Sequence, residues 1–309
     1  MSSLAGRDII EIPALTKDEI DLILSTSRQF ESRLEKERIV PLLSEHILAT
    51  LFYEPSTRTR LSFEAAMHRL GGRVISVAEV SSSSVAKGES IDDTVRTIEQ
   101  YADVIVMRHP EAGAAQIAAD AVNIPLINAG DGTRNHPTQA LLDLYTIEKE
   151  RGTINGQTIA LVGDLKYGRT THSLAEALTR YRVRLLLVSP PELSMPERIL
   201  AQLQQAGLPF AQTSDIEEAI READVMYVTR IQRERFPSPA EYDRFRGVFQ
   251  VDPALVERST RRVTVMHPLP RVDEISHQLD AHPAAAYFRQ ARNGVYVRMA
   301  LLALVLGQA

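Results

Sequence analysis

The chain of 309 residues contains no cysteine. This absence excludes disulfide bonds, thiolate catalysis and metal sites built from cysteine ligands. The 8 histidines show no spacing typical of metal ligands, and no group of residues resembles a Ser-His-Asp triad. We therefore expect neither a metal nor a cofactor.

Three further features are missing. The formal net charge is −5, so no general positive field is present to attract nucleic acid. The longest apolar run, VRMALLALVLG, is too short to span a bilayer. The first residues, MSSLAGRDIIEIPALTKDE, carry early acidic side chains and lack the apolar core of a secretory signal. We expect a soluble cytoplasmic protein that binds neither nucleic acid nor membrane, in which any anion site is local.

The length and an apolar content of 44% favour two domains, each with a core of its own. Runs of Val, Ile and Leu alternate with helical patterns in both halves, without a fixed-period repeat. This alternation predicts an α/β protein of two domains, each a parallel β-sheet flanked by helices. Helices are expected to start at a capping box over Thr16 and Glu19 (ending near Glu37) and near Thr57, Ile91 and Ala114, with a largely buried closing helix from Tyr287 to Leu306. The predicted strands are Ile47–Tyr53, Val74–Val80, Val104–Met107, Pro125–Asn128 and, later, TIALVGD, RLLLVSP, DVMYVTR and VTVMHPLP.

The segment EPSTRTRL places Ser56 to Thr59 in the first turn of a predicted helix, where backbone N–H groups lack partners within the helix. An ordinary N-cap by Ser56 is one interpretation. It leaves Arg58 and Arg60 unexplained, because a cation at a helix N-terminus opposes the helix dipole by up to about 1 kcal/mol. A bound phosphate would reverse that effect and use the free N–H groups and hydroxyls.

Other polar groups in the first half also follow predicted strands. The serine-rich loop SSSSVAKGES is either a flexible polar loop or a means of offering Lys87 to an anion. Arg108 ends an apolar strand and needs a partner, which is either a structural salt bridge or a ligand. His136 and Gln139 lie one turn apart at a helix start, where the histidine either has a loop role or polarises a carbonyl group as a neutral imidazole.

In the second half, Gly163 and Gly168 precede Arg169, one letter from the nucleotide-binding pattern G-x-x-x-x-G-K-[ST]. A guanidinium in place of the lysine favours a carboxylate over a nucleotide. Arg230 and Gln232 follow another strand and face one side if the chain is extended. The segment His-Pro-Leu-Pro then forms a rigid turn with carbonyl acceptors, and its Leu-Pro bond is either cis or trans.

Together, FYEPSTRTRLSFEAA, the loop ending Lys-Gly-Glu, MRHP, HPTQALLDLYTI, VGDLKYGRT, TRIQRER and MHPLPRVDE resemble the catalytic chain of the aspartate carbamoyltransferase family. The resemblance covers nearly the whole length. It implies the carbamoyltransferase fold and transfer of the carbamoyl group of carbamoyl phosphate to aspartate, the committed step of pyrimidine and UMP biosynthesis. It also implies a carbamoyl phosphate-binding domain of residues 1–136 with a C-terminal helix 290–309, an interdomain helix 137–149 and an aspartate-binding domain of residues 150–285.

The resemblance assigns roles to particular residues. The phosphate would be bound by Ser56, Thr57, Arg58 and Thr59. The carbonyl oxygen, where negative charge grows in the transition state, would be bound by Thr59, Arg108 and His136. By the resemblance, Gln139 and the carbonyls of Leu269 and Pro270 would accept hydrogen bonds from the carbamoyl NH₂ group. The two carboxylates of aspartate would be bound by Arg169, Arg230 and Gln232.

Ser83 and Lys87 are expected, by resemblance, to reach the site of a neighbouring subunit, which implies a homotrimer with shared active sites. Of these residues, the ones expected to act in catalysis are Arg58, Thr59, Lys87, Arg108 and His136. Assembly with a regulatory chain or a dihydroorotase is left open by the sequence.

Three alternatives compete with this assignment. The ornithine carbamoyltransferases share the phosphate and carbamoyl motifs, but that relative typically has a cysteine in the His-x-Leu-Pro turn and a Ser-Met-Gly loop. Here the turn contains Pro268 and the second-half loop carries Arg230 and Gln232, which suit an acidic substrate. A non-catalytic homologue is disfavoured because the phosphate and carbonyl motifs are all present. A nucleotide switch at Gly163–Thr170 lacks a clear acidic partner for magnesium.

Overall fold

Two compact units make up the chain. One comprises Met1–Tyr145 and Arg292–Ala309, and the other comprises Thr146–Ala291. The divisions fall inside α5 (Pro137–Arg151) and α11 (Tyr287–Val305), so each of these helices contributes residues to both units. The computed structural model describes residues 4–77, 88–132, 135–233, 236 and 238–309.

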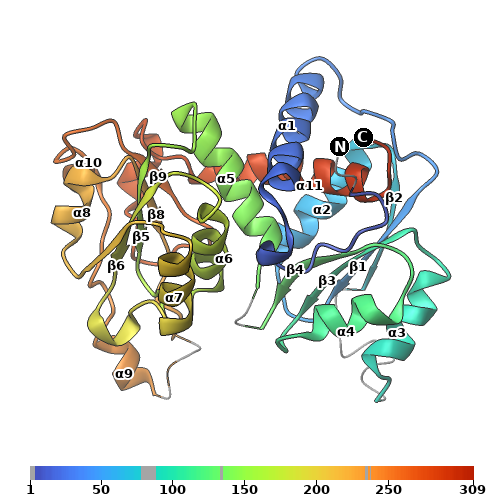
Figure 1. Cartoon of the computed structure of the whole chain (residues 1–309), viewed down its shortest axis with the longest axis horizontal. Coiled ribbons are helices and arrows are strands. Elements are labelled where there is room, and N and C mark those ends of the chain that lie inside the picture. The colour runs from blue at the N-terminus through green and yellow to red at the C-terminus, as the bar shows by residue number, and fades with distance from the viewer. Residues whose placement is uncertain (1–3, 78–87, 133–134, 234–235, 237) are drawn as a thin grey trace. The chain divides into compact units, whose positions relative to one another are not determined.

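The first unit is built on a sheet with strand order β2-β1-β3-β4, in which all neighbouring strands pair in parallel (Figure 1). Helices cover both faces of this sheet, with α3 and α4 on one face and α1 and α2 on the other. The strands are β1 (Ile47–Phe52), β2 (Arg73–Val77), β3 (Val104–His109) and β4 (Leu126–Asp131). The helices are α1 (Lys17–Leu34), α2 (Thr57–Arg69), α3 (Ile91–Glu99) and α4 (Ala114–Ala121).

The core of this unit follows from the two-residue period of its strands. Ala49 and Leu51 of β1 point to the same face as Ile105 and Met107 of β3, because alternate residues of a strand share a face. They pack there with buried alanines of α4, such as Ala118. Small residues on α4 let the helix approach the sheet closely, so an Ala-rich helix suits this position.

The second unit contains a sheet of order β7-β6-β5-β8-β9, again with parallel pairing throughout. Figure 1 shows α8 and α10 on one face of it, with α6 and α7 on the other. The strands are β5 (Thr158–Val162), β6 (Arg184–Val188), β7 (Phe210–Thr213), β8 (Val225–Val228) and β9 (Thr264–Met266). The helices are α6 (Arg169–Leu178), α7 (Glu197–Gln205), α8 (Ile216–Glu222), α9 (Pro239–Asp243) and α10 (Pro253–Val256).

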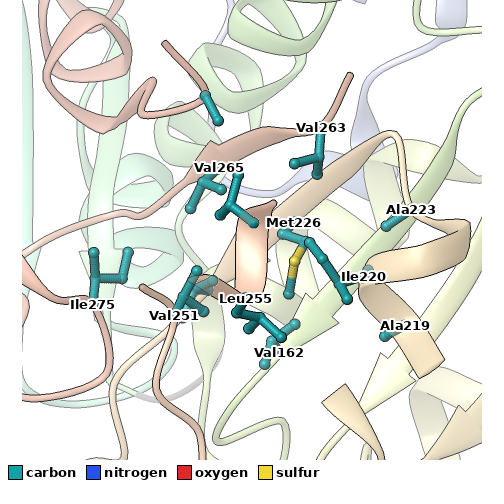
Figure 2. Close-up of a cluster of buried hydrophobic side chains, with 14 of the residues drawn as sticks. Val162, Ala219, Ile220, Ala223, Met226, Val251, Leu255, Val263, Val265 and Ile275 are labelled. Atoms are coloured by element: carbon teal, nitrogen blue, oxygen red, sulfur yellow. The ribbon is translucent and has the colours of Figure 1, made fainter. Parts of the chain in front are cut away.

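Figure 2 shows one hydrophobic cluster of this unit, in which Val162 and Met226 of neighbouring strands pack with Ile220 of α8 and Leu255 of α10. All four side chains are less than a tenth exposed. Burying a side chain of this size contributes about 1.5–3 kcal/mol relative to leaving it in water, so the cluster holds helices and sheet together.

The fold confirms the predicted class: two parallel sheets flanked by helices. Helices begin at Thr57, Ile91 and Ala114, and the capping box of Thr16 and Glu19 is present in both directions. The closing helix ends at Val305, one residue before the predicted end, and its last two turns are buried.

Some element ends differ from the predictions. The first helix ends at Leu34 and not near Glu37. The strand predicted as Pro125–Asn128 runs from Leu126 to Asp131, because Asp131 still pairs with His109 of β3 after a register shift. Within the described residues, no helix is both long enough and apolar enough to cross a membrane.

Candidate active site

In each unit the predicted site residues follow strands that are neighbours in the sheet. In the first unit the described ones lie at the end of β3 or follow β1 and β4, and these strands are adjacent in the order β2-β1-β3-β4. In the second they follow β5, β8 and β9, which are adjacent in the order β7-β6-β5-β8-β9. Parallel strands end at the same edge of a sheet, where ligands bind in open α/β folds. Each unit therefore gathers its own set of polar side chains.

The loop after β1 leads directly into α2, which begins at Thr57. Ser56 occupies the N-cap position, but within the described part of the chain its side chain makes no capping hydrogen bond. The interpretation of Ser56 as the N-cap residue is therefore confirmed for its position, whereas the side-chain hydrogen bond of an ordinary cap is not formed among the described residues. Thr57 and Arg58 are exposed and Thr59 is buried, whereas Arg60 pairs with Glu64 at 3.8 Å along the helix. The first turn thus keeps the anion-binding capacity of a helix N-terminus.

Arg108 lies near the end of β3 and is buried. Its Nη2 donates to Glu54 Oε1 at 2.8 Å, and its Nη1 donates to the carbonyl of Ala129 at 3.3 Å. Glu54 follows β1 and Ala129 belongs to β4, so the guanidinium is held from both neighbouring strands. The structural salt bridge expected as one alternative is present, and it fixes the cation at the strand ends.

His136 and Gln139 lie at the start of α5, and both are buried. The backbone N–H of Gln139 donates to the backbone carbonyl of His136 at 3.0 Å. In the side chain, Nε2 of Gln139 donates to Oδ1 of Asp143 at 2.8 Å. An amide whose nitrogen donates in this way keeps its oxygen as an acceptor. Arg298 of α11 is buried nearby, and burial lowers the pKa of its guanidinium to about 10, an effect that the charge of Asp143 opposes.

The loops after β5 and β8 of the second unit approach each other closely. Gly163 has φ +120°, and a Cβ on it would lie 2.2 Å from the backbone oxygen of Thr229. A Cβ on Gly168 would lie 2.4 Å from the oxygen of Asp164. Both glycines of the nucleotide-like pattern are thus accounted for by backbone packing. Packing removes the main support for a nucleotide loop.

Asp164 joins these two loops. It is fully buried, and it accepts hydrogen bonds from the N–H of Tyr167 at 2.9 Å and of Gln232 at 3.4 Å. Burial raises the pKa of its carboxyl, and these backbone hydrogen bonds oppose the rise. The Gln232 Nε2 also donates to the carbonyl of Tyr167 at 3.0 Å. These hydrogen bonds hold Gln232 beside the loop that leads to Arg169, the first residue of α6.

Arg230 follows β8 and is half-buried, as are Arg169 and Gln232. The loop after β9 contains His267, which is buried, and the two residues expected to offer carbonyl acceptors. The Leu269-Pro270 peptide bond is cis, and Leu269 has φ +58°. A leucine in this left-handed region costs roughly 1–2 kcal/mol, so the surroundings must hold it there.

Ser83 and Lys87 lie outside the described residues, so their expected role stays a prediction. Among the residues that are described, no group of three or more His, Asp or Glu side chains is placed to hold a metal ion.

Three acidic residues that were not among the predicted site residues hold candidate site residues in place. These are Glu54, Asp143 and Asp164. Two of them carry a signal in the sequence. Asp143 lies four residues after Gln139, the spacing at which helix side chains meet. Asp164 follows an apolar strand and a glycine, a position where a carboxylate is either a ligand or a backbone acceptor.

Two family sequence models match the chain. The carbamoyl-P binding domain of aspartate/ornithine carbamoyltransferase matches residues 7–149, and the Asp/Orn binding domain matches residues 155–305. The chain belongs to the aspartate/ornithine carbamoyltransferase family. The predicted resemblance is thereby confirmed.

Relatives of this family resemble the chain over almost its full length. The aspartate carbamoyltransferase catalytic subunit of Thermococcus gammatolerans is 55% identical over 302 residues, which cover 98% of each chain. The Trypanosoma cruzi aspartate transcarbamoylase in complex with carbamoyl phosphate and aspartate is 41% identical, covers 98% of each chain and has a TM-score of 0.93. Its complex with N-(phosphonacetyl)-L-aspartic acid is 40% identical, covers 98% of this chain and 97% of the other, and has a TM-score of 0.92.

His172 fastens α6 to the loop before it. Its Nε2 lies 2.7 Å from the carbonyl of Leu165, and its Nδ1 lies 3.1 Å from the Nη2 of Arg198. Because Arg198 can only donate, Nδ1 accepts and Nε2 carries the proton, so the ring is neutral. Burial, followed by the charge of Arg198, lowers the pKa of His172 to about 4, while the bond to Leu165 opposes this.

The lowered pKa predicts a loss of stability in acid. Below the ordinary pKa of 6.5, the unfolded chain binds a proton at His172 that the folded chain excludes until about pH 4. Between pH 7 and pH 4.5, the wild type should lose about 2 kcal/mol more unfolding free energy than His172→Gln does. Urea unfolding at both pH values measures this difference, with His68→Asn, which changes an exposed histidine, as the control. Equal losses in wild type and His172→Gln would contradict the neutral, buried ring.

Proposed function

We propose that this chain transfers the carbamoyl group of carbamoyl phosphate to the α-amino group of L-aspartate, giving N-carbamoyl-L-aspartate and phosphate. The observation that carries the proposal is that one chain contains two sets of polar side chains, one in each unit. One set suits a phosphate and a carbonyl group and lies in the unit matched by the carbamoyl-P binding domain. The other is cationic and lies in the unit matched by the Asp/Orn binding domain. The two Trypanosoma cruzi complexes, with carbamoyl phosphate and aspartate and with N-(phosphonacetyl)-L-aspartic acid, support the same substrates.

Residue roles follow from this proposal. The start of α2, with Ser56, Thr57, Arg58 and Thr59, binds the phosphate through N–H groups, hydroxyls and a guanidinium. Thr59, Arg108 and His136 stabilise the negative charge on the carbonyl oxygen of the tetrahedral intermediate. Carbamoyl phosphate binding is assigned to residues 1–136 and 290–309, with residues 137–149 as the helix between the domains.

The remaining polar residues recognise the NH₂ group and the second substrate. Gln139 accepts from the carbamoyl NH₂ together with the carbonyls of Leu269 and Pro270. Arg169, Arg230 and Gln232, in the aspartate domain of residues 150–285, bind the two carboxylates. Guanidinium groups suit this task, because their fork of donors matches a carboxylate.

The chemical step needs little acid–base help from the protein. The neutral amine of aspartate attacks the carbonyl carbon, the C–O bond to phosphate breaks, and the departing phosphate takes the proton that the amine loses. The rate then comes mainly from orientation of the two substrates and from fixed positive groups at the growing charge. The product supplies pyrimidine and UMP biosynthesis in the cytoplasm.

The choice of acceptor tests this function directly. The purified chain is assayed with carbamoyl phosphate and, in parallel, with L-aspartate, L-ornithine and an N-acetylated relative of ornithine. We expect carbamoyl transfer to aspartate at least about 1,000-fold faster than to ornithine, because an ammonium side chain meets Arg169 and Arg230 where a carboxylate belongs. Faster transfer to ornithine would establish the sibling activity. Absence of transfer to every acceptor would favour a non-catalytic homologue.

We also propose a homotrimer in which Ser83 and Lys87 of one subunit complete the site of the next. Arg58→Ala and Lys87→Ala chains should each be nearly inactive. When the two are mixed and reassembled at random, half of the sites keep Arg58 and half of their neighbours supply Lys87, so about a quarter of the activity should return.

A second mixture serves as the control for subunit sharing. Arg58→Ala and Arg169→Ala change residues that the proposal places in the same subunit's site, so no mixture of these chains rebuilds a complete site. Activity should stay low in this control. Recovery in both mixtures, or in neither despite demonstrated exchange of subunits, would contradict the sharing of Lys87 between subunits.

A further inference from the structure

Leu269 is the one non-glycine residue with a positive φ among the residues that the structure describes. Side chains other than glycine rarely adopt this conformation, because the Cβ crowds the backbone. Such a residue persists where its surroundings over-determine it, and residues of this kind cluster at functional sites. Leu269 lies in the loop after β9, and the group that holds it is found two residues earlier.

His267 supplies that group. Its Nδ1 accepts a hydrogen bond from the N–H of Leu269 at 2.7 Å. Since Nδ1 accepts, the ring proton lies on Nε2, which donates to Glu274 Oε1 at 2.6 Å. Burial lowers the pKa of His267, and this keeps the imidazole in the neutral form that both hydrogen bonds require.

Glu274 continues the chain of hydrogen bonds back to the same loop. Its second oxygen, Oε2, accepts from the N–H groups of Val272 and Asp273, each at 3.1 Å. Burial raises the pKa of Glu274, but the hydrogen bonds from His267 and from backbone N–H groups outweigh burial, so the pKa lies below its ordinary value. A neutral ring and a carboxylate therefore connect the start of the loop to its end.

This pair is buried and anchored to its surroundings. His267 is 2% exposed and Glu274 is 5% exposed. The N–H of His267 donates to Gln290 Oε1 at 2.8 Å, and Arg271 is held by Asp280 through both of its terminal nitrogens. Hydrogen bonds shielded from water hold their geometry more strongly than exposed ones.

We infer that His267 and Glu274 are positioning residues that fix the carbonyls of Leu269 and Pro270 as a rigid pair of acceptors. The inference rests on the proposed function, in which these carbonyls accept from the carbamoyl NH₂ group. A fixed acceptor pair also sets specificity. An acetyl group has a methyl in place of the NH₂ and cannot donate, so it leaves the two carbonyls without hydrogen bonds. The pair thus selects carbamoyl phosphate over acetyl phosphate.

The test compares two substitutions of one side chain. His267→Leu removes the acceptor for the Leu269 N–H, whereas His267→Asn keeps it, because an asparagine oxygen readily accepts from the N–H two residues on. We expect His267→Leu to lower kcat/KM for carbamoyl phosphate about 100-fold and His267→Asn to lower it less than about tenfold. Inhibition by acetyl phosphate should change less than about threefold in both variants, because it uses no donor to the carbonyls.

His282 provides a matched control, because its Nδ1 also accepts from the N–H two residues on, that of Ala284, at 3.1 Å. His282→Leu removes the same kind of local hydrogen bond and should leave both constants unchanged. If His267→Leu fails to fold, Glu274→Gln serves as the second variant. Its amide cannot accept from His267 and the two backbone N–H groups together, so carbamoyl phosphate selectivity should fall in the same direction.

Two failures are distinguishable. A wild-type chain that transfers no carbamoyl group to aspartate overturns the proposed function, and with it the role of the turn. If the wild type is active, two results overturn the positioning role alone. One is that His267→Leu lowers kcat/KM for carbamoyl phosphate and weakens inhibition by acetyl phosphate to the same extent. The other is that His267→Asn lowers kcat/KM for carbamoyl phosphate as much as His267→Leu does.

Discussion

Parallel pairing of strands is the constraint on which the rest of the structure depends. Every strand pair in the two described sheets is parallel, so the strands of each sheet end at one edge. Loops that are far apart in sequence, such as those after β1 and β4 or after β5 and β9, come to the same edge of their sheet by this rule, and the strand order sets how close they lie. The helix starts that follow them add N–H groups at the same edge, which prepares each unit for anionic or polar ligands.

Carboxylates that are buried or partly buried hold those loops in place. Glu54 pairs with Arg108, Asp143 accepts from Gln139, and Asp164 joins the loops after β5 and β8. Glu274 does the same for the loop after β9 through His267. A chain of net charge −5 thus uses acidic side chains to orient the groups that are proposed to bind the two substrates.

Much of this organisation was predictable from the sequence, because hydrophobic period and helix-start signals are local. The helix starts at Thr57 and Ile91 are examples. Features that depend on distant partners were not predictable. The strand continued to Asp131 because β3 extends to pair with it, and within the described part of the chain Ser56 makes no side-chain cap although its residue type favours one. The hydrogen bond between His267 and the N–H of Leu269 depends on a buried Glu274 and on the positive φ of Leu269, and neither feature has a signal in the sequence.

The central claim is that the first turn of α2 binds the phosphate of the first substrate. It is tested most directly by calorimetric titration with N-(phosphonacetyl)-L-aspartic acid, whose phosphonate and carboxylates match both polar sets. We predict one molecule bound per chain, affinity at least about 100-fold weaker in Arg58→Ala, and affinity within about threefold of wild type in Arg60→Ala, whose guanidinium pairs with Glu64. Equal weakening in the two variants, or undiminished binding by Arg58→Ala, would contradict the account.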